Sequence, residues 1–324
     1  MSSILVTGAN GFVGHALCGA LASHGHDVTA LVRRPGAFTG ATRQWSHGEA
    51  DFLGLAEAWP RDFAPDCVVH LAARVHVMND TVADPLAAFR ATNVEGTLRV
   101  ARAAHERGVR RLVFVSSVKA AAEWDGGVPL AESMPVSPAG AYGCSKLQAE
   151  EALWQYGAQS GLEIVIVRPP LVYGPGVGAN FLQMMNALWR RLPLPLGAVE
   201  ARRSIVYVEN LADALMHCAI DPRAANLCFY VRDDQDPSVA GLLRALGSHL
   251  GRPARLVPMP VSLLRAAGML TGRVAQIDRL TQSLRVDDSL IRTTLGWTTP
   301  YTVDEGLAAT ARWFRFTRGM NGER

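Results

Sequence analysis

The chain has little lysine, little clustered charge and no long apolar segment. Only two of its 32 basic residues are lysines, Lys119 and Lys146, and the net charge of +3 is small for 324 residues. No run of Lys and Arg exceeds a doublet, so nothing in the sequence predicts nucleic-acid binding. No apolar stretch approaches the ~18 residues that span a bilayer, and the first residues contain no basic leader, so we expect neither membrane insertion nor secretion.

Cysteine is also scarce, and its positions follow no pattern. The five cysteines occur without a CxxC motif and without the spacing of zinc ligands. An odd, scattered set fits reduced thiols, which predicts a cytoplasmic protein. His70 and His76 suggest a metal, but no third ligand has suitable spacing, so we expect no metal site and place His70 in the core.

The first two-thirds of the chain alternates β-branched runs with helical patterns. Nearly continuous Val, Ile and Leu strands separated by helices predict a parallel sheet covered on both faces, which is a Rossmann-type doubly wound α/β fold. Strands are expected at 3–8, 27–33, 67–73, 111–117 and 163–169, and helices at 12–24, 85–108 and 144–160.

The alternation ends after about residue 175. The stretch "RSIVYVENLADALMHCAI" predicts a strand, a helix N-cap at Asn210 and a helix, and the last 90 residues contain short helices bounded by proline. We therefore expect a Rossmann domain over 1–175 with a returning segment at about 204–230. Residues 176–324 are expected to form mainly a smaller α/β substrate-binding lobe.

Three glycines mark the turn after the first expected strand. In "VTGANGFVG", Gly8, Gly11 and Gly14 stand between an apolar strand and a helix. Glycine permits the tight turn and a close approach of the backbone to a pyrophosphate, while the helix N-terminus, with Phe12 and Val13, attracts its charge. A purely structural turn is the alternative. The position of the motif predicts binding of NAD(H) or NADP(H).

A tyrosine and a lysine stand four positions apart in "AYGCSKLQAE". On a helix, Tyr142 and Lys146 would lie on one face and could converge on one cofactor. A tyrosine with its usual pKa of about 10 is a poor base, and an adjacent ammonium would favour the phenolate. A compact lysine suits this role better than a planar arginine. A nearby hydroxyl should come from Ser116 or Ser117 at the end of the preceding strand, where a simple strand-end hydrogen bond is the alternative.

Together these motifs resemble the extended short-chain dehydrogenase/reductases of the NAD-dependent epimerase/dehydratase family. "TGANGFVG", "HLAA", "TNVEGT", "VSS", "YGCSK" and "RPPLVYGPG" occur in that family's order and spacing, and the resemblance extends from residue 3 to about 313. It implies a nicotinamide dinucleotide, a sugar-nucleotide substrate, and Ser117 as the group that polarises the substrate oxygen beside Tyr142 and Lys146.

The resemblance also implies the remaining binding residues. Cofactor contacts are implied for Asp51 and Phe52 at the adenine, and for Leu71, Ala72, Ala73, Asn93, Ser116, Tyr142, Lys146 and Pro169. Substrate contacts are implied for His76, Ser116, Ser117, Asn180, Phe181, Arg203 and Arg279.

Four arginines bear on the choice of cofactor and on the substrate contacts. Arg33 and Arg34 stand where NAD-preferring relatives carry an acid, so they favour a 2′-phosphate and NADP(H), unless they belong to a solvated loop. Arg203 would grip the diphosphate, with a surface ion pair as the alternative. The stretch "IDRLTQSLR" departs from the epimerase pattern, which leaves Arg279 as a candidate only.

Two activities share this machinery. "LAARVHVMND" and "PLPLGAVEARRS" look most like the subgroup that reduces UDP-4-keto-6-deoxy-N-acetylhexosamines for bacterial surface polysaccharide of the O-antigen type. That reduction at C4 is our first prediction, and a UDP-glucose or UDP-N-acetylglucosamine 4-epimerase with tightly bound NAD is the second. A non-catalytic NAD(P)-binding sensor or scaffold is a third option. The expected partner is a UDP-sugar, and because many relatives dimerise, a homodimer is one option for this chain.

Overall fold

The centre of the protein is a seven-stranded parallel sheet, in a computed structural model that describes residues 1–34, 36, 40–75 and 84–320. The strand order is β3-β2-β1-β4-β5-β6-β9. Its strands are β1 (Ser3–Thr7), β2 (Asp27–Val32), β3 (Arg43–Ser46), β4 (Cys67–His70), β5 (Arg111–Val115), β6 (Glu163–Arg168) and β9 (Cys228–Tyr230). All six neighbouring pairs run parallel, which confirms the predicted Rossmann-type fold.

The five predicted strands are present, and each ends earlier than the apolar pattern suggested. β4, for example, ends at His70 rather than at residue 73, and β5 ends at Val115 rather than at residue 117. At these carboxyl ends the chain leaves the sheet to form loops, and those loops carry the candidate site. The strands β3 and β9 were not predicted, because they are edge strands of only four and three residues.

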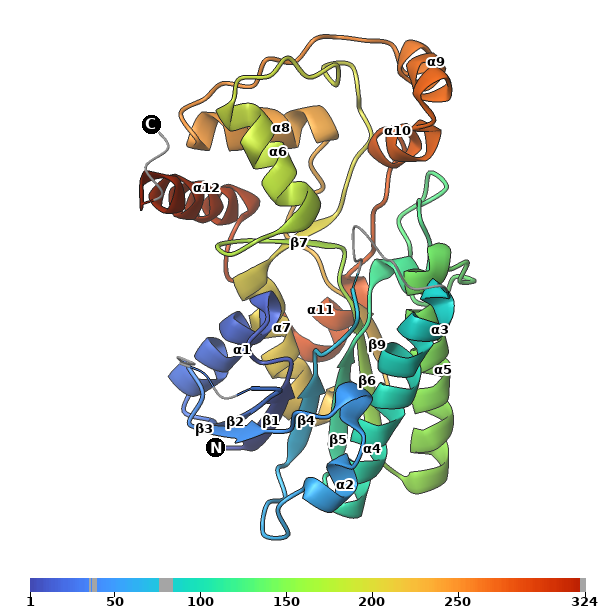
Figure 1. Cartoon of the computed structure of the whole chain (residues 1–324), viewed down its shortest axis with the longest axis vertical. Coiled ribbons are helices and arrows are strands. Elements are labelled where there is room, and N and C mark those ends of the chain that lie inside the picture. Colours follow the sequence, from blue (N-terminus) through green and yellow to red (C-terminus); the bar gives the residue numbers. More distant parts are fainter. Residues whose placement is uncertain (35, 37–39, 76–83, 321–324) are drawn as a thin grey trace.

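Helices cover both faces of the sheet (Figure 1). One face packs against α1 (Phe12–Ser23) and α7 (Val208–Ile220), and the other against α4 (Thr97–Glu106) and α5 (Gly140–Ser160). The shorter elements beside α4 and α5 are α2 (Leu55–Ala58), α3 (Pro85–Arg90) and a π-helical segment, Ala91–Gly96. The α3, π-helical and α4 segments together fill the range predicted as one helix over 85–108.

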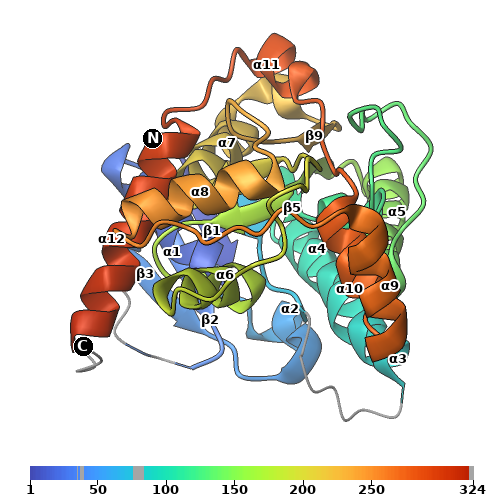
Figure 2. The same ribbon diagram turned by 90° about the horizontal axis from the view of Figure 1, so that it is seen from above.

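A second, mainly helical lobe lies beyond the carboxyl ends of the strands (Figures 1 and 2). Its two parallel strands are β7 (Leu171–Tyr173) and β8 (Ile205–Tyr207). Its helices are α6 (Ala179–Trp189), α8 (Val239–His249), α9 (Val261–Thr271), α10 (Val274–Thr281) and α12 (Val303–Met320). A separate hydrophobic cluster that includes Tyr173, Phe181, Leu243 and Phe314 holds this lobe together.

The chain returns to the first lobe after α10. The helix α11 (Ser289–Leu295) inserts Ile291 and Leu295 into the cluster beneath the sheet. Trp297 joins that cluster, and its indole N–H donates to Asp213 of α7 at 2.8 Å. Within the described residues, no helix is both long and apolar enough to cross a membrane.

The predicted N-cap at Asn210 is wrong. The helix α7 begins at Val208, and Asn210 is fully buried in its first turn. Its amide N–H group donates to Asp233 at 2.7 Å and to the carbonyl of Tyr301 at 2.8 Å, while its oxygen accepts from the Tyr301 backbone N–H at 2.9 Å. The polar side chain therefore joins two distant segments to α7 instead of capping the helix.

Candidate active site

The glycine turn between β1 and α1 has no space for larger residues. Gly8 has φ +65°, and a Cβ atom there would lie 2.8 Å from the backbone nitrogen of Ala72. A Cβ at Gly14 would lie 2.4 Å from the carbonyl oxygen of Gly8. Gly11 is the N-cap of α1, and no side chain caps this helix. A bare backbone at a helix N-terminus fits the pyrophosphate of a dinucleotide.

The ends of β1 and β4 are joined through a buried histidine. The two ring nitrogens of His70 lie 2.7 Å from the Thr7 hydroxyl and 3.1 Å from the Thr97 hydroxyl. Burial lowers the pKa of His70 to about 3, so the ring is neutral. His70 is thus a core residue that supports the loop of Leu71, Ala72 and Ala73. Among the residues that the structure describes, no three His, Cys, Asp or Glu side chains are grouped to hold a metal ion.

The predicted adenine-side residues adopt an unusual backbone conformation. Asp51 and Phe52 have φ of 49° and 58°, in the left-handed region that non-glycine residues seldom occupy. The Thr92 hydroxyl donates to the Asp51 carboxylate at 2.6 Å, and the Phe52 ring packs edge-on to His70. These contacts hold the segment beside the loop that follows β4. Arg33 and Arg34 are exposed just after β2.

The structure brings Ser117 and Tyr142 together. Ser117 follows the end of β5 and caps a single 3-10 turn, accepting from the backbone N–H of Lys119 at 3.2 Å. Tyr142 lies in the first turn of α5, close to the predicted helix start, and its hydroxyl is hydrogen-bonded to Ser117. Desolvation raises the pKa of Tyr142 to about 12, and the Ser117 hydrogen bond opposes this rise. The protein's own groups therefore favour the neutral phenol rather than the expected phenolate.

Lys146 lies one helical turn after Tyr142 and is almost completely buried. Its ammonium donates to the carbonyl of Val115 at 2.8 Å and lies 4.3 Å from the centre of the Phe114 ring. Burial lowers the pKa of Lys146 to about 7, and the negative charge of Glu150 opposes that fall. The charge on Lys146 is consequently sensitive to small changes near neutral pH.

Ser116 points away from Ser117. Its hydroxyl is buried and donates to the Glu150 carboxylate, which also forms an ion pair with Arg168. This placement matches the strand-end hydrogen bond that was the alternative for Ser116, and it removes the hydroxyl from the sugar contact we expected. Sequence reasoning missed Glu150 and Arg168. The available signal was an acid one turn after Lys146 and an arginine within an apolar strand.

Asn93 and Pro169, which were also predicted to contact the cofactor, stabilise the backbone around Tyr142 and Ser117. The buried side chain of Asn93 accepts from the backbone N–H of Arg74 at 2.8 Å and donates to the hydroxyl of Ser145 at 3.0 Å. Ser145 in turn donates to the carbonyl of Tyr142. The carbonyl of Pro169 accepts from the Val118 N–H at 2.9 Å, which secures the turn that follows Ser117.

Cationic side chains gather between the two lobes near Ser117. Lys119, Arg203 and Arg279 are close enough to influence one another, and the pKa of Lys119 is lowered mainly by burial and next by the charge of Arg279. Burial also lowers the pKa of Arg203, while Asp125 and Glu123 oppose that shift. Arg279 is exposed and donates to Glu123 at 2.7 Å.

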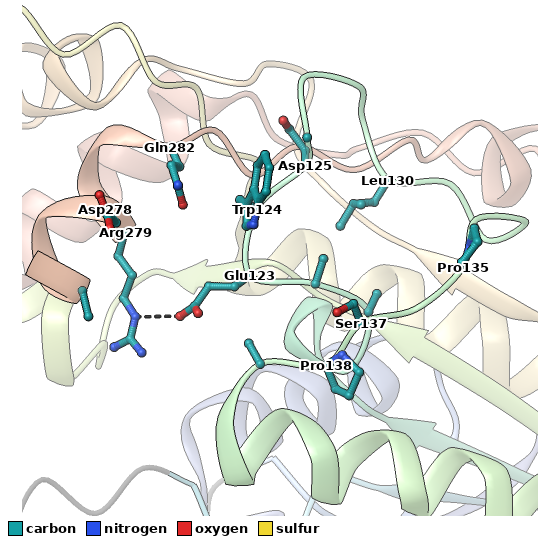
Figure 3. A pocket seen from close by; sticks show the side chains of 15 residues that line it. Glu123, Trp124, Asp125, Leu130, Pro135, Ser137, Pro138, Asp278, Arg279 and Gln282 are labelled. Carbon is teal, nitrogen blue, oxygen red and sulfur yellow. Dashed lines mark hydrogen bonds and ion pairs between the residues drawn. The ribbon is translucent and has the colours of Figure 1, made fainter. Parts of the chain in front are cut away.

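A cavity of about 600 Å³ adjoins this cationic group (Figure 3). Its walls are the loop that follows the Ser117 turn and α10, and the ion-paired Glu123 and Arg279 both line it. Trp124, Leu130 and Pro138 provide apolar surface, and Ser137 and Gln282 provide groups that can hydrogen-bond. This mixed lining is typical of a small-molecule site.

The remaining substrate predictions have different outcomes. Asn180 is exposed in the first turn of α6. Phe181 is 1% exposed, and its ring stacks on Tyr173 with centroids 5.6 Å apart. The Phe181 side chain is therefore part of the core of the second lobe and is not placed to contact a substrate. His76 lies outside the described residues.

Comparisons with known proteins agree with this architecture. Residues 4–227 match the NAD dependent epimerase/dehydratase family. The chain is 37% identical over 314 residues to a UDP-glucose 4-epimerase of Vibrio cholerae, covering 96% of this chain and 95% of that protein.

Two solved structures are similar in fold. A UDP-glucose 4-epimerase of Thermotoga maritima, solved with UDP-glucose, has a TM-score of 0.77 at 23% identity over 97% of this chain and 99% of its own. The Bordetella bronchiseptica enzyme WbmG, solved with NAD and UDP, has a TM-score of 0.75 at 21% identity over 97% of this chain and 95% of its own. With its glycine turn, its Tyr142–Ser117 pair and this match, the chain belongs to the NAD-dependent epimerase/dehydratase family and is an enzyme that uses a nicotinamide dinucleotide.

Proposed function

We propose that the protein is an NADPH-dependent 4-ketoreductase that acts in the cytoplasm on a UDP-4-keto-6-deoxy-N-acetylhexosamine, for surface polysaccharide of the O-antigen type. The observation that carries this proposal is the hydrogen-bonded pair of Ser117 and Tyr142, in which desolvation raises the pKa of Tyr142 to about 12. A neutral phenol can give a proton to a ketone oxygen, and reduction of a ketone begins with that form.

Each residue of the proton-transfer site has a role in this reaction. When bound, the nicotinamide supplies the hydride for the C4 carbonyl. Ser117 donates a hydrogen bond to the carbonyl oxygen, and Tyr142 transfers its hydroxyl proton to the same oxygen as the alcohol forms. The charged form of Lys146 stabilises the phenolate that remains on Tyr142. One hydride and one proton together complete the alcohol.

The first lobe provides the cofactor contacts. We assign residues 1–175, with the returning segment 204–230, to the cofactor. The turn of Gly8, Gly11 and Gly14 holds the pyrophosphate, and Asp51 and Phe52 flank the adenine. The exposed pair Arg33 and Arg34 supports NADPH, because two guanidinium groups after β2 suit a 2′-phosphate and offer no acceptor to a ribose diol.

The second lobe, mainly residues 176–324, receives the UDP-sugar. We assign Arg203 and Lys119, which are close enough to interact electrostatically, to the diphosphate, and Asn180 lies at the exposed N-terminus of α6. The cavity beside Trp124 offers a surface for the sugar and its substituents, because an aromatic ring with amide and hydroxyl groups suits both a pyranose and an N-acetyl group.

A second candidate function is a UDP-hexose 4-epimerase. The 37% identity to the Vibrio cholerae UDP-glucose 4-epimerase over nearly the full length supports it. In that reaction the same residues act twice: Tyr142 first accepts a proton from the C4 hydroxyl and later returns it. The enzyme would then retain NAD throughout the cycle.

The cofactor released from the purified, denatured protein separates the two functions. For a reductase we expect less than one dinucleotide per chain, and rapid NADPH oxidation when a UDP-4-keto-6-deoxy-N-acetylhexosamine is added. Stoichiometric NAD, with interconversion of UDP-N-acetylglucosamine and UDP-N-acetylgalactosamine and no NADPH oxidation, would overturn the reductase in favour of the epimerase.

A further inference from the structure

A buried acid lies directly behind the proton-transfer site. Glu150 is on α5, one helical turn after Lys146, and is only 1% exposed. Its carboxylate accepts from the Arg168 guanidinium at 2.5 Å and 3.0 Å and from the Ser116 hydroxyl. Three such donors give this buried carboxylate a fixed orientation.

Glu150 also determines the electrostatics around Lys146. His70 from β4 and Glu150 from α5 interact electrostatically with the Lys146 ammonium. Tyr142 lies one turn before Lys146 on α5, and Arg168 from β6 pairs with Glu150. His70 and Tyr142 are neutral near pH 7, because burial lowers the pKa of His70 to about 3 and raises that of Tyr142 to about 12. Glu150 is thus the described group whose charge favours the ammonium, against the effect of burial.

The same carboxylate anchors both strand ends that frame the Ser117 turn. Its hydrogen bond to Ser116 fixes the end of β5. Because successive side chains of an extended segment point to opposite sides, fixing Ser116 directs the Ser117 side chain toward Tyr142. Through Arg168 it holds the end of β6, where the next residue, Pro169, accepts from the backbone of that turn.

We propose that Glu150 is a positioning residue of the reaction. From the same helix as Lys146, its buried carboxylate keeps Lys146 in the ammonium form, and it orients Ser117 through Ser116. The proposal rests on the proposed function only where it concerns turnover, because the charge on Lys146 can be measured without a sugar or a cofactor. Activity should require the ammonium, so it is present below the pKa of Lys146 and lost as the pH rises through it.

The scarcity of lysine makes a direct test simple. Protein labelled with ¹³C only at the lysine ε-carbon contains two labelled residues, and Lys119→Arg identifies the signal of Lys146. We expect Lys146 to titrate with a pKa of about 7 in the wild type. In Glu150→Gln the titration should move to lower pH by about one unit, because the favourable charge is lost.

Two companion variants keep the result interpretable. Glu150→Gln/Arg168→Met removes both ends of the ion pair, so it should fold even if Glu150→Gln alone does not, and it should also lower the pKa of Lys146. Glu163→Gln breaks another Arg–Glu pair, that of Arg111 at the opposite end of β5, and should leave the Lys146 titration unchanged.

Kinetics then separate positioning from general structural damage. In Glu150→Gln the alkaline fall of kcat should begin at lower pH than in the wild type, whereas the profile of Glu163→Gln should overlay it. An unchanged Lys146 titration in either folded Glu150 variant would overturn the proposal. If the Lys146 titration shifts in the Glu150 variants but the wild-type enzyme reduces no 4-keto-sugar, the role of Glu150 toward Lys146 is upheld and the proposed function is rejected.

Discussion

Two Arg–Glu pairs, each with a buried arginine, lie at opposite ends of β5 and β6. At the amino end, Arg111 of β5 bonds to Glu163 of β6 at 2.8 Å. At the carboxyl end, Arg168 of β6 bonds to Glu150 of α5 at 2.5 Å. Both arginines are well buried, but the Glu163 side chain is 27% exposed and that of Glu150 only 2%.

Their surroundings differ. Arg111 also donates to the carbonyls of Cys218 and Asp221 at 3.1 Å and 2.6 Å, where α7 ends. Its contacts therefore join β5 to β6 and to the end of α7. The carboxylate of Glu150 instead reaches Ser116 and influences Lys146. In doubly wound sheets, ligands bind at the carboxyl ends of the strands. An ion pair at the carboxyl end of the sheet can therefore serve the site as well as stability.

The largest expected difference in kcat is between substitutions of the two tyrosines at opposite ends of α5. Tyr142→Phe removes the proton donor at the carboxyl end, and we expect kcat to fall about 10³-fold or more while the dinucleotide still binds. Tyr156→Phe, at the other end of the same helix, should leave kcat unchanged. Equal turnover in Tyr142→Phe and wild type would exclude the assigned proton donor.

The glycines of α1 allow a similar comparison for the cofactor. In Gly14→Ala the added methyl would lie 2.4 Å from the Gly8 carbonyl oxygen, so the turn and the helix must separate. We expect NADPH affinity to fall at least about 10-fold and stability to fall by about 1–3 kcal/mol. Gly19→Ala is the matched control, because among the described residues a Cβ there meets nothing within 4 Å, and alanine favours the helix. Isothermal titration and denaturation in urea measure both quantities.

The carboxyl end of β2 should decide between the two dinucleotides. Arg33→Ser/Arg34→Ser removes the two exposed guanidinium groups, and KM for NADPH should rise about 10-fold while KM for NADH changes little. Steady-state kinetics with each cofactor provide the comparison. A parallel change in both KM values would show that the pair does not read the 2′-phosphate and belongs to a solvated loop.

The smallest effect on activity is expected at the amino end of the sheet. Glu163→Gln leaves the buried Arg111 without its counter-charge, so unfolding in urea should require about 1–3 kcal/mol less free energy. Its kcat and KM should match the wild type, since the pair is remote from Ser117 and Tyr142. A loss of turnover in the folded variant would remove the distinction between the two ends.

The parts of the site that local patterns determine could be predicted from the sequence. The turn of Gly8, Gly11 and Gly14 depends on backbone space at a strand–helix junction, and the Tyr142–Lys146 pair depends on helical spacing alone. The parallel sheet followed from its continuous apolar strands. Each of these features is encoded within a few consecutive residues.

The parts that depend on packing between distant segments could not be predicted in the same way. The local pattern does not separate Ser116 from Ser117, and only the family resemblance favoured Ser117. The hydrogen bond from Ser116 to Glu150, which pairs with Arg168, shows which way the strand end faces. Phe181 follows an exposed Asn180, yet its ring stacks on Tyr173 in the core of the second lobe. The return of α11 to the first lobe likewise depends on a contact between distant segments, the hydrogen bond from Trp297 to Asp213 of α7.

The most direct test of the account is a deuterium-transfer measurement. The purified protein is given a UDP-4-keto-6-deoxy-N-acetylhexosamine and NADPH that carries deuterium at the transferring position, and the product is examined by NMR and mass spectrometry. A 4-ketoreductase should place one deuterium at C4 of the sugar for each NADPH oxidised. An unlabelled product, or interconversion of two UDP-hexoses without NADPH oxidation, would contradict the proposed function.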